Sequence, residues 1–429
     1  MRKQFFSLVA VIVCLSGCSR GSLFSLSNRP TDEPYKLEHV SAIQNPEFRQ
    51  TMGNLLGPPI VEGNKIETLL NGDQIFPPML EAIHSAKKTI TFESYIYWQG
   101  EIAQKFTDAL CDAAKRGVKV HVILDSVGAD KIDKKYLDRM KECGVEYVMY
   151  HGLHWYDIIA TQRLNNRTHR KLLVVDGEVG FTGGVGVADE WLGNADSPKH
   201  WRDTHYRVEG PAVEQLQAAF ADNWMETTGH GLAGADYFPV DHTQRGDLSA
   251  QVFKSSSDSG SESMELMYLL SMSAARKNIR LATAYFVPDK LTIQTLLKAR
   301  QRGVSVQIIV PGGHIDEKIV RRASRARWGE MLQAGIEIYE YQPTMYHCKQ
   351  MIVDDQWVSI GSANLDNRSF RLNDEANLNV MNQAFASQQI RVFDEDLKKC
   401  NRITYDQWKH RPIGEQLIEG FSTLFGPWM

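Results

Sequence analysis

The sequence predicts an α/β protein whose two halves repeat one another along the chain. Its 429 residues are 43% hydrophobic and 23% charged, a composition that supports large buried cores and excludes global disorder. Amphipathic helical segments alternate with short apolar runs, as in helices packed on a sheet. A motif of His, Lys and Asp occurs twice, beginning at His169 and at His347. These features predict two α/β/α sandwich domains, over residues 61–245 and 246–429.

The first 17 residues are typical of a secretory signal. Arg2 and Lys3 precede an apolar stretch, Phe5 to Leu15, that is too short to span a bilayer. The stretch ends in Leu-Ser-Gly followed by Cys18, which resembles the lipobox of bacterial lipoproteins. This resemblance implies cleavage before Cys18 and a lipid on that cysteine, which would anchor the protein to a membrane. An uncleaved signal anchor is the alternative interpretation.

The segment after Cys18 predicts a tether and a place in the cell envelope. Residues 18–60 are mostly polar and include Pro30, Pro34 and Pro46, which favours a flexible connection between membrane and globular body. Lipoproteins that resemble this one, with Ser19 rather than Asp after the cysteine, are usually sorted to the outer membrane where one exists. We therefore expect a lipoprotein that faces the periplasm or the cell exterior.

Charge, hydropathy and cysteine content limit the classes of protein to which this chain can belong. Lys and Arg number 48 against 52 for Asp and Glu, which opposes a nucleic-acid binder with its usual basic excess. No run of about 20 apolar residues occurs, so a polytopic membrane protein is excluded. Four cysteines lie beyond the predicted lipidation site: Cys111, Cys143, Cys348 and Cys400. An exported compartment permits disulfides between them, but their spacing along the chain selects no pairing, and unpaired buried thiols are an equal alternative.

Two stretches of the chain share one order of strand, helix and strand. The sequence AKKTITFESYIY at 86–97 is similar to ARKNIRLATAY at 275–285. An amphipathic segment ending in Arg-Gly-Val follows each stretch, and the glycine predicts the end of a helix. The apolar runs 118–124 and 304–310 come next and predict buried strands. A serine-rich stretch, 255–263, predicts a linker or loop between the halves.

The repeated motif follows H-x-K-x4-D-x6-G-[GS] in both halves. His and Lys at positions i and i+2 of a strand share one face, so each copy presents an imidazole and an amine together. A strand edge made polar by chance could explain one copy, but not two copies in corresponding places. The first copy contains His169, Lys171, Asp176 and Gly183-Gly184, and the second contains His347, Lys349, Asp354, Gly361-Ser362 and Asn364.

This doubled motif resembles the signature of the phospholipase D superfamily, also called the HKD family. The resemblance covers roughly residues 66–429, and the strings WRDTH at 201–205, AYFVPD at 284–289 and LDNRSF at 365–370 are similar to the cardiolipin synthase branch. It implies two phospholipase D-like domains, related by a pseudo-two-fold axis, that share one active site. An apolar tail, 417–428, predicts a helix that either docks on the core or contacts a membrane.

The chemistry of phosphodiester transfer needs these residue types. A neutral imidazole can attack phosphorus and split one difficult displacement into two easier ones. A second, protonated imidazole can give its proton to the leaving oxygen and later take one from the acceptor alcohol. Two lysines can neutralise the non-bridging oxygens, so no metal or other cofactor is expected. The resemblance implies that His169 is the nucleophile and His347 the acid, whereas the near-symmetric sequence leaves their order open.

Each imidazole needs a carboxylate that fixes its tautomer and stabilises its cation. Asp203 and Glu375 occupy corresponding places in the two repeats, and the resemblance implies that each serves a catalytic histidine, within its own half or across to the other. An ion pair with Arg202 or Arg207 is the alternative for Asp203. The motif aspartates Asp176 and Asp354 follow the strands and are expected to hold loops through backbone hydrogen bonds, although they belong to the catalytic motif.

Three further motif positions are expected to support the bound phosphate: Gly184, Ser362 and Asn364. The place of Asn364 is taken by Gly186 in the first copy, so one side-chain amide is missing there. Asp374 also stands where the synthase branch tends to have an aromatic residue. These departures weaken the assignment to a branch more than the assignment of the reaction.

The expected function is a phosphatidyltransferase that makes cardiolipin from phosphatidylglycerol through a phosphatidyl-histidine intermediate. An anchor at Cys18 would favour phospholipids over soluble diesters by raising the local substrate concentration. A phospholipase D that hydrolyses head groups is the nearest alternative. A nuclease and a decayed lipid-binding protein are weaker ones, because the charge balance opposes the first and two complete motifs oppose the second.

Overall fold

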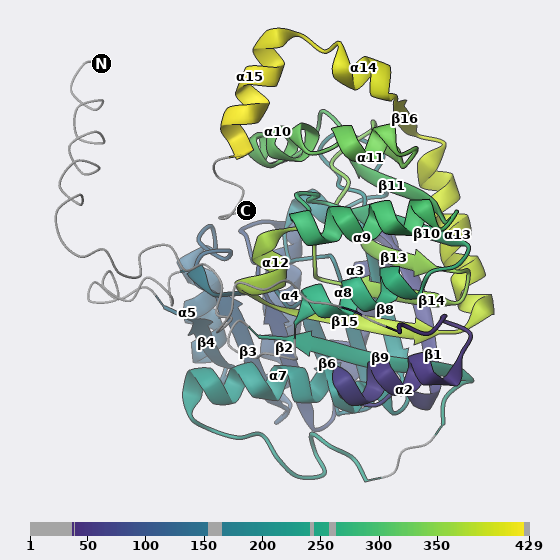
Figure 1. Ribbon diagram of the computed structural model, residues 1–429. Coiled ribbons are helices and arrows are strands. Elements are labelled where there is room, and N and C mark those ends of the chain that lie inside the picture. Colours follow the sequence, from purple (N-terminus) through teal and green to yellow (C-terminus); the bar gives the residue numbers. More distant parts are fainter. Residues whose placement is uncertain (1–36, 38, 153–164, 241–243, 257–262, 424–429) are drawn as a thin grey trace, which may run out of the picture. The chain divides into compact units, whose positions relative to one another are not determined.

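The computed structural model describes residues 37, 39–152, 165–240, 244–256 and 263–423 (Figure 1). In the first half, strands and helices alternate as the sequence predicts. Its elements are β1 (Val61–Leu70), α3 (Asn71–Ser85), β2 (Thr89–Ser94), α4 (Glu101–Lys115), β3 (Lys119–Asp125), α5 (Lys134–Glu142), β4 (Glu146–Tyr150), β5 (Arg167–Thr168), β6 (Leu172–Val175), β7 (Val179–Gly183), the short 3₁₀ helix η2 (Asp189–Trp191), β8 (Thr204–Glu209) and α7 (Ala212–Thr228).

The second half repeats this order and adds a C-terminal extension. Its elements are β9 (Leu248–Ser255), α8 (Met264–Ala274), β10 (Asn278–Thr283), α9 (Lys290–Gln301), β11 (Ser305–Pro311), α10 (Lys318–Ala326), α11 (Gly329–Gln333), β12 (Glu337–Tyr341), β13 (Lys349–Val353), β14 (Trp357–Gly361), α12 (Asn367–Arg371), β15 (Asn373–Met381) and α13 (Gln383–Leu397). The extension consists of β16 (Cys400–Ile403), α14 (Tyr405–Lys409) and α15 (Ile413–Ser422).

One sheet runs through both halves, and its strand order shows the duplication. From the centre outward, the first half reads β1-β8-β7-β6-β2-β3-β4, and the second reads β9-β15-β14-β13-β10-β11-β12, with β16 at the outer edge. The two orders correspond strand for strand. The halves meet where β1 pairs antiparallel with β9, Val61 opposite Ala250. The predicted pair of tandem α/β domains with pseudo-two-fold symmetry is thereby confirmed.

Local sequence explains where the repeated elements end. Gly117 and Gly303 adopt φ angles of 91° and 88°, the left-handed conformation that glycine accepts most readily, and they end α4 and α9. The strands predicted at 118–124 and 304–310 are β3 and β11, each starting and ending one residue later than expected. Both strands pair in parallel with their neighbours and are almost wholly buried, which requires helices on both faces.

The apolar residues form three large cores. One packs β2 and β3 against α3, α4 and α5, and a second packs β10 and β11 against α8, α9 and α11. The third contains residues of both halves, including Leu216 and Phe220 of α7 and Phe385 and Phe393 of α13. The halves are therefore joined by a common core as well as by the β1–β9 pair.

Two expectations about the connections need correction. The serine-rich stretch 255–263 does not lie between the halves, because β9 comes before it and already belongs to the second half of the sheet. The predicted tether, residues 18–60, contains the helix α2 (Pro46–Leu55), whose Phe48 and Met52 are buried in the second-half core. Phe48 packs edge-on against Trp357. Because the segment is rich in proline and polar residues, its sequence did not indicate that a few apolar side chains pack its last part against the body.

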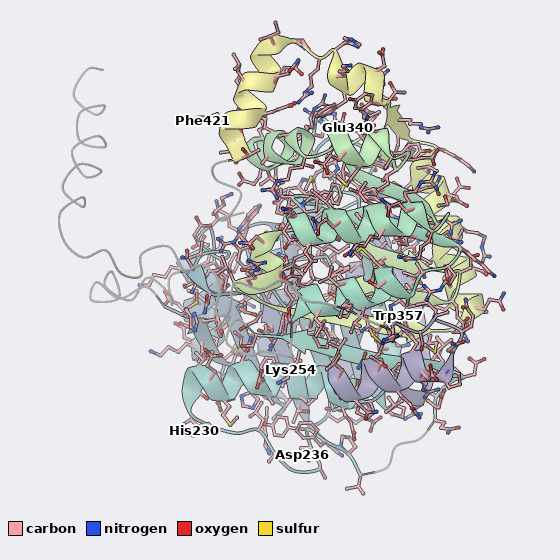
Figure 2. The ribbon with its side chains drawn as sticks, in the orientation of Figure 1. His230, Asp236, Lys254, Glu340, Trp357 and Phe421 are labelled. Carbon is pink, nitrogen blue, oxygen red and sulfur yellow. A yellow bond between two sulfur atoms is a disulfide. The ribbon has the colours of Figure 1, made fainter. Side chains whose placement is uncertain are left out.

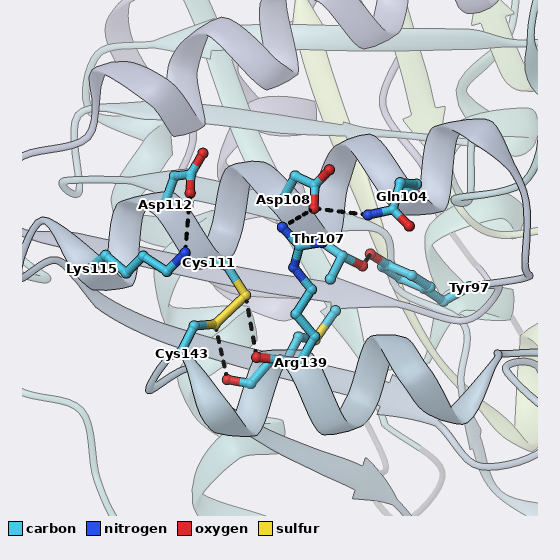
Figure 3. Close-up of a disulfide and its surroundings, with 10 residues drawn as sticks. Tyr97, Gln104, Thr107, Asp108, Cys111, Asp112, Lys115, Arg139 and Cys143 are labelled. Carbon is cyan, nitrogen blue, oxygen red and sulfur yellow. Dashed lines mark hydrogen bonds and ion pairs between the residues drawn. A yellow bond between two sulfur atoms is a disulfide. The ribbon is translucent and has the colours of Figure 1, made fainter.

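A disulfide joins α4 to the end of α5. Cys111 and Cys143 are bonded, with their Cα atoms 5.4 Å apart, and Figure 3 shows the bridge beside Arg139. The spacing of the four cysteines did not select this pair, because the two helices are brought together only by packing. Cys348 and Cys400 are free thiols.

Breaking this disulfide is expected to destabilise the first half. The bond closes a loop with a sequence separation of 32 residues. Restricting the unfolded chain in this way contributes about 2–4 kcal/mol. Cys143→Ser should lower the unfolding midpoint in guanidinium chloride, and a reducing agent should lower the wild-type midpoint equally. Cys400→Ser serves as the control, since it should keep the response to reduction; a midpoint indifferent to reduction in the wild type would contradict the prediction.

No helix within the described ranges has the length and apolar character needed to cross a bilayer. The predicted signal and lipidation site lie outside these ranges, as do the last five residues of the predicted apolar tail, 424–428.

Candidate active site

A short parallel pairing between the halves positions the first motif histidine. The two residues of β5 pair with the start of β15, Thr168 opposite Asp374. The His169 N–H then donates to the Asp374 carbonyl at 2.8 Å. This register places the His169 ring beside Glu375, with Nδ1 at 3.0 Å from both carboxylate oxygens. A histidine of the first half is therefore served by a carboxylate of the second.

The second motif histidine is held by the corresponding contacts in the other half. Arg202 forms a parallel bridge with Tyr346, and the His347 N–H donates to the Arg202 carbonyl at 2.8 Å. His347 Nδ1 lies 2.7 Å from Oδ2 of Asp203. The carboxylates are thus exchanged between the halves, which is one of the two arrangements that the sequence left open. The alternative for Asp203, an ion pair with the side chain of Arg202 or Arg207, does not occur within the part of the chain that the structure describes.

The same motif position supports the carboxylate differently in the two halves. Ser362 donates its hydroxyl to Glu375 at 2.5 Å. In the first half this position is Gly184, where an added Cβ would lie 2.3 Å from a carboxylate oxygen of Asp203. Trp191 Nε1–H donates to the same carboxylate at 3.0 Å instead. Gly184 and Ser362, which were expected to support phosphate, both lie against the carboxylates. Gly184 leaves space for Asp203, and Ser362 donates a hydrogen bond to Glu375.

The two lysines lie next to the histidines on their own strands. Lys171 Nζ donates to the His169 carbonyl at 2.7 Å, and Lys349 Nζ donates to the His347 carbonyl at 2.8 Å. Lys349 Nζ is also 3.0 Å from Nδ1 of His347. Both amines are buried, as the shared strand face predicts. Each half therefore presents an imidazole and an ammonium group together.

Burial sets the protonation of the imidazoles. It lowers the pKa of His169 to about 4, and the facing carboxylate of Glu375 offsets this only in part. Burial and the charge of Lys349 likewise lower the pKa of His347. Lys349 also lowers the pKa of His169 through its charge, and this coupling between motifs of opposite halves places them in one electrostatic environment. Both imidazoles are therefore neutral near pH 7 without substrate.

The other charged groups of the site are shifted as well. Burial alone would raise the pKa of Glu375, but His169, Lys171 and the Ser362 hydroxyl outweigh it and lower that pKa to about 2. The pKa of Asp203 is lowered for the same kind of reason, with His347 as the main partner. Burial lowers the pKa of Lys171 to about 7. A phosphate anion between the lysines would favour their charged forms.

Aromatic side chains flank both imidazoles. The Tyr95 ring meets the His169 ring edge-on, with centroids 5.2 Å apart. Trp191 and Trp201 lie 5.2 and 5.5 Å from the His347 ring. These rings restrict the imidazoles to one orientation. Only Trp201 had a sequence signal, because it begins the WRDTH string.

The motif aspartates do not approach the histidines. Each follows its strand, whereas the histidine precedes that strand, so the two ends lie about 20 Å apart along the chain. Asp176 accepts backbone N–H groups of Lys87, Lys88 and Thr89 at 2.7–2.9 Å. Asp354 accepts those of residues 276–278 at 2.7–3.1 Å. They hold the turn before β2 and β10, as the sequence analysis expected, and they are not part of the reacting centre.

The remaining departures from the motif have packing explanations. A Cβ at Gly186 would lie 2.9 Å from Cβ of Ile96, so the first half has no room for a counterpart of Asn364. Oδ1 of Asn364 is buried and accepts no hydrogen bond from the described side chains and backbone. Asp374 accepts the Tyr150 hydroxyl at 2.6 Å, which explains a buried carboxylate where an aromatic residue was expected.

Two buried arginines, which sequence reasoning missed, tie the halves together beside the site. Arg202 binds Asp396 of α13 through two hydrogen-bond-length contacts of 2.9 Å. Arg170 donates to the carbonyls of Ala219 at 2.7 Å and of Ser255 at 3.0 Å. Arg170 occupies a variable position of the motif, so the motif gave no sign of its role. Within the described chain no three His, Cys, Asp or Glu side chains gather as they would around a metal.

Comparison with known proteins identifies the family. A family model described as "Cardiolipin synthase, PLD-like domain" matches residues 79–224 and 268–397, one segment in each half. Cardiolipin synthase 1 of Bacillus anthracis is 36% identical over 380 residues, which cover 86% of this chain and 74% of that protein. The chain belongs to the phospholipase D superfamily, in its cardiolipin synthase branch. It is an enzyme of that superfamily.

Other members of the phospholipase D superfamily agree in sequence or in fold. The major cardiolipin synthase of Bacillus subtilis is 34% identical over 368 residues, covering 85% of this chain and 76% of that protein. A crystal structure of phosphatidylserine synthase from Haemophilus influenzae superposes with a TM-score of 0.68 at 15% identity, over 89% of this chain and 99% of that one. At this identity the second comparison shows a shared fold alone.

Proposed function

We propose that the protein is a phosphatidyltransferase that makes cardiolipin from two molecules of phosphatidylglycerol and releases glycerol. The observation that carries this proposal is the exchange of carboxylates between the halves, His169 with Glu375 and His347 with Asp203. Two oriented imidazoles and two buried amines form the set of groups that a two-step transfer at phosphorus needs. Its cardiolipin synthase relatives support a phospholipid substrate and cardiolipin as the product.

In the first step His169 acts as the nucleophile. Glu375 accepts a hydrogen bond from Nδ1–H, so the lone pair of Nε2 is free to attack phosphorus. The N–P bond forms as the bond from phosphorus to the glycerol oxygen breaks. The bound phosphodiester anion raises the pKa of His347, and the imidazolium, stabilised by Asp203, gives its proton to the departing oxygen. The assignment of the two roles follows the family resemblance.

In the second step the acceptor hydroxyl of another phosphatidylglycerol replaces glycerol. His347, now neutral, removes the hydroxyl proton as the new O–P bond forms and the N–P bond breaks. His169 leaves neutral and His347 is protonated again, so the site returns to its starting state. Lys171 and Lys349 stabilise the charge that develops on the non-bridging oxygens in both steps.

We also propose that lipid on Cys18 anchors the enzyme to a membrane of the cell envelope, facing the periplasm or exterior, and to the outer membrane where one is present. The signal-like sequence before this cysteine supports the anchor. A disulfide between Cys111 and Cys143 is compatible with an oxidising compartment. Mass spectrometry of the mature N-terminus should detect acyl chains in the wild type and none in Cys18→Ser.

The lipid products test the proposed reaction. Purified wild-type protein given phosphatidylglycerol vesicles should form cardiolipin and glycerol in equal amounts. If phosphatidic acid forms without cardiolipin, the protein is instead a phospholipase D that uses water as the acceptor. Added glycerol should reverse the reaction and lower cardiolipin yield, because both directions share one phosphatidyl-enzyme intermediate.

The carboxylate beside His169 should control the acid side of the pH profile. Activity requires neutral His169, whose pKa is about 4, so kcat/KM should fall as the pH drops toward that value. Glu375 raises this pKa, so Glu375→Gln should move the fall to lower pH. The same substitution should lower kcat by about 10²-fold or more, because the tautomer is no longer fixed. The measurement is a pair of pH–rate profiles.

The matched control is Glu209→Gln, which removes a carboxylate on β8 that pairs with Arg207 and lies outside the site. Its profile should coincide with that of the wild type. An acid limb that stays in place in Glu375→Gln would show that another group controls it.

A further inference from the structure

Helix α15 turns its apolar side chains away from the body of the protein. Ile413 is 76% exposed, Leu417 70% and Ile418 47%. At 100° per residue these side chains occupy one stripe of the helix. Helices on globular proteins normally present such a stripe to the core. This one faces outward.

The opposite, polar face of α15 is the one that docks. Glu419 is 3% exposed and accepts Arg325 Nε–H at 3.1 Å and Arg411 Nε–H at 2.6 Å. Arg325 also donates to Glu340 of β12 at 2.9 Å, and Figure 2 shows Glu340 close to α10 and α11. This buried ion network fixes the rotation of α15, so the outward stripe is a consequence of specific packing.

Helix α10, which packs beside α15, adds a further exposed aliphatic side chain and positive charge (Figure 1). Ile319 is 37% exposed on it. Lys318 and Arg322 are exposed, and neither forms an ion pair with another described residue. Cations at the border of an apolar stripe are the pattern of helices that lie on anionic lipid surfaces.

This surface adjoins the candidate active site. Asp316 precedes α10 by two residues and accepts the Tyr285 hydroxyl at 2.7 Å. Its charge raises the pKa of both His347 and Lys349, so it lies close to the second motif. The segment that leads into α10 therefore lies near the second motif, and α10 itself carries the exposed Lys318, Ile319 and Arg322.

We propose that the lipid-facing surface, formed by Ile319, Ile413, Leu417 and Ile418 with Lys318 and Arg322, binds an anionic phospholipid bilayer. It would hold the mouth of the active site against the membrane that supplies the substrate, a choice of partner that rests on the proposed function. A second copy of the chain fits less well, because four aliphatic side chains cannot supply the roughly 800 Å² per partner of a stable interface.

A local probe tests the contact without relying on activity. An environment-sensitive fluorophore on Leu417→Cys, in the full chain carrying Cys400→Ser, should shift to shorter wavelength when phosphatidylglycerol vesicles are added. The matched position is Met225→Cys on α7, an apolar residue 54% exposed in the first half, which should show no shift. An unchanged spectrum at position 417 would overturn the inference, whatever lipid products the enzyme makes.

Turnover provides the second measurement. The turnover rate of Leu417→Asp/Ile418→Asp on phosphatidylglycerol vesicles should be at least about tenfold lower than that of the wild type, since inserted aliphatic side chains dominate the binding of such helices to a bilayer. Its rate on a monomeric short-chain phosphatidylglycerol should equal that of Met225→Asp and the wild type. Replacing Lys318 and Arg322 by Gln should weaken binding to anionic vesicles about fivefold for each charge, but not binding to phosphatidylcholine.

The outcomes separate this inference from the proposed function. A shift at position 417 without cardiolipin formation would keep the surface and reject the reaction. Cardiolipin formation that is equal on vesicles for all variants would keep the reaction and reject the surface. A wild-type dimer that Leu417→Asp/Ile418→Asp converts to a monomer, with lipid binding unchanged, would also reject it.

Discussion

Replacing His169 with alanine is expected to lower the rate of phosphatidyl transfer by at least about 10⁴-fold, because the group that forms the bond to phosphorus is removed. The neighbouring groups cannot take its place. Glu375 is held by His169 and Ser362, and Lys171 donates to a backbone carbonyl. The measurement is the initial rate of cardiolipin formation from phosphatidylglycerol vesicles.

His347→Ala should also lower the rate of phosphatidyl transfer, by about 10²–10⁴-fold relative to the wild type, because the leaving oxygen loses its proton donor. The two histidines can be told apart with a phosphodiester whose leaving group, such as p-nitrophenolate, departs without a proton. On this substrate His347→Ala should still release p-nitrophenol and form a covalent adduct at His169, detectable by mass spectrometry. His169→Ala should form none.

His200→Ala is the control for both variants, since His200 is only partly buried and pairs with Asp196 outside the site. It should retain the wild-type rate. An adduct on His347, formed in His169→Ala, would reverse the assigned roles, and full activity in both alanine variants would reject the mechanism.

Replacing Arg202 with methionine is expected to destabilise the protein by about 3–5 kcal/mol, the cost of leaving a buried charge without its partner. Arg202 and Asp396 are both buried and face each other across the two halves. Without the guanidinium group, the Asp396 carboxylate keeps, among the described residues, only the hydrogen bond from the Tyr346 hydroxyl at 3.2 Å. The free energy of unfolding in guanidinium chloride measures the loss.

A second substitution distinguishes a buried charge from lost packing. Arg202→Met/Asp396→Leu removes both charges and should recover most of the stability, because an apolar pair replaces a buried ion pair at little cost. Arg207→Met, at a half-buried arginine of β8, should cost less than about 1 kcal/mol. A double variant as unstable as Arg202→Met alone would show that the arginine acts through its shape.

Local patterns in the sequence determined the elements of the fold. The apolar runs placed β3 and β11 to within one residue, and the glycines at 117 and 303 indicated where the preceding helices end, because strand burial and helix termination depend on a few neighbouring residues. The doubled motif placed His169 with Lys171, and His347 with Lys349, on shared strand faces for the same reason. The backbone role of Asp176 and Asp354 was also predictable from their place after a strand.

Tertiary structure alone decided how these parts meet. Glu375 reaches His169 because β5 and β15 pair in one register, a contact between residues 206 positions apart. The space that Gly184 leaves for Asp203, and the disulfide between Cys111 and Cys143, depend on elements packed from different parts of the chain. The apolar tail could dock or face outward, and the buried ion network around Glu419 selects the outward position of α15. Sequence periodicity fixes which face of an element is apolar, whereas the partner of that face is set by long-range packing, which no local pattern contains.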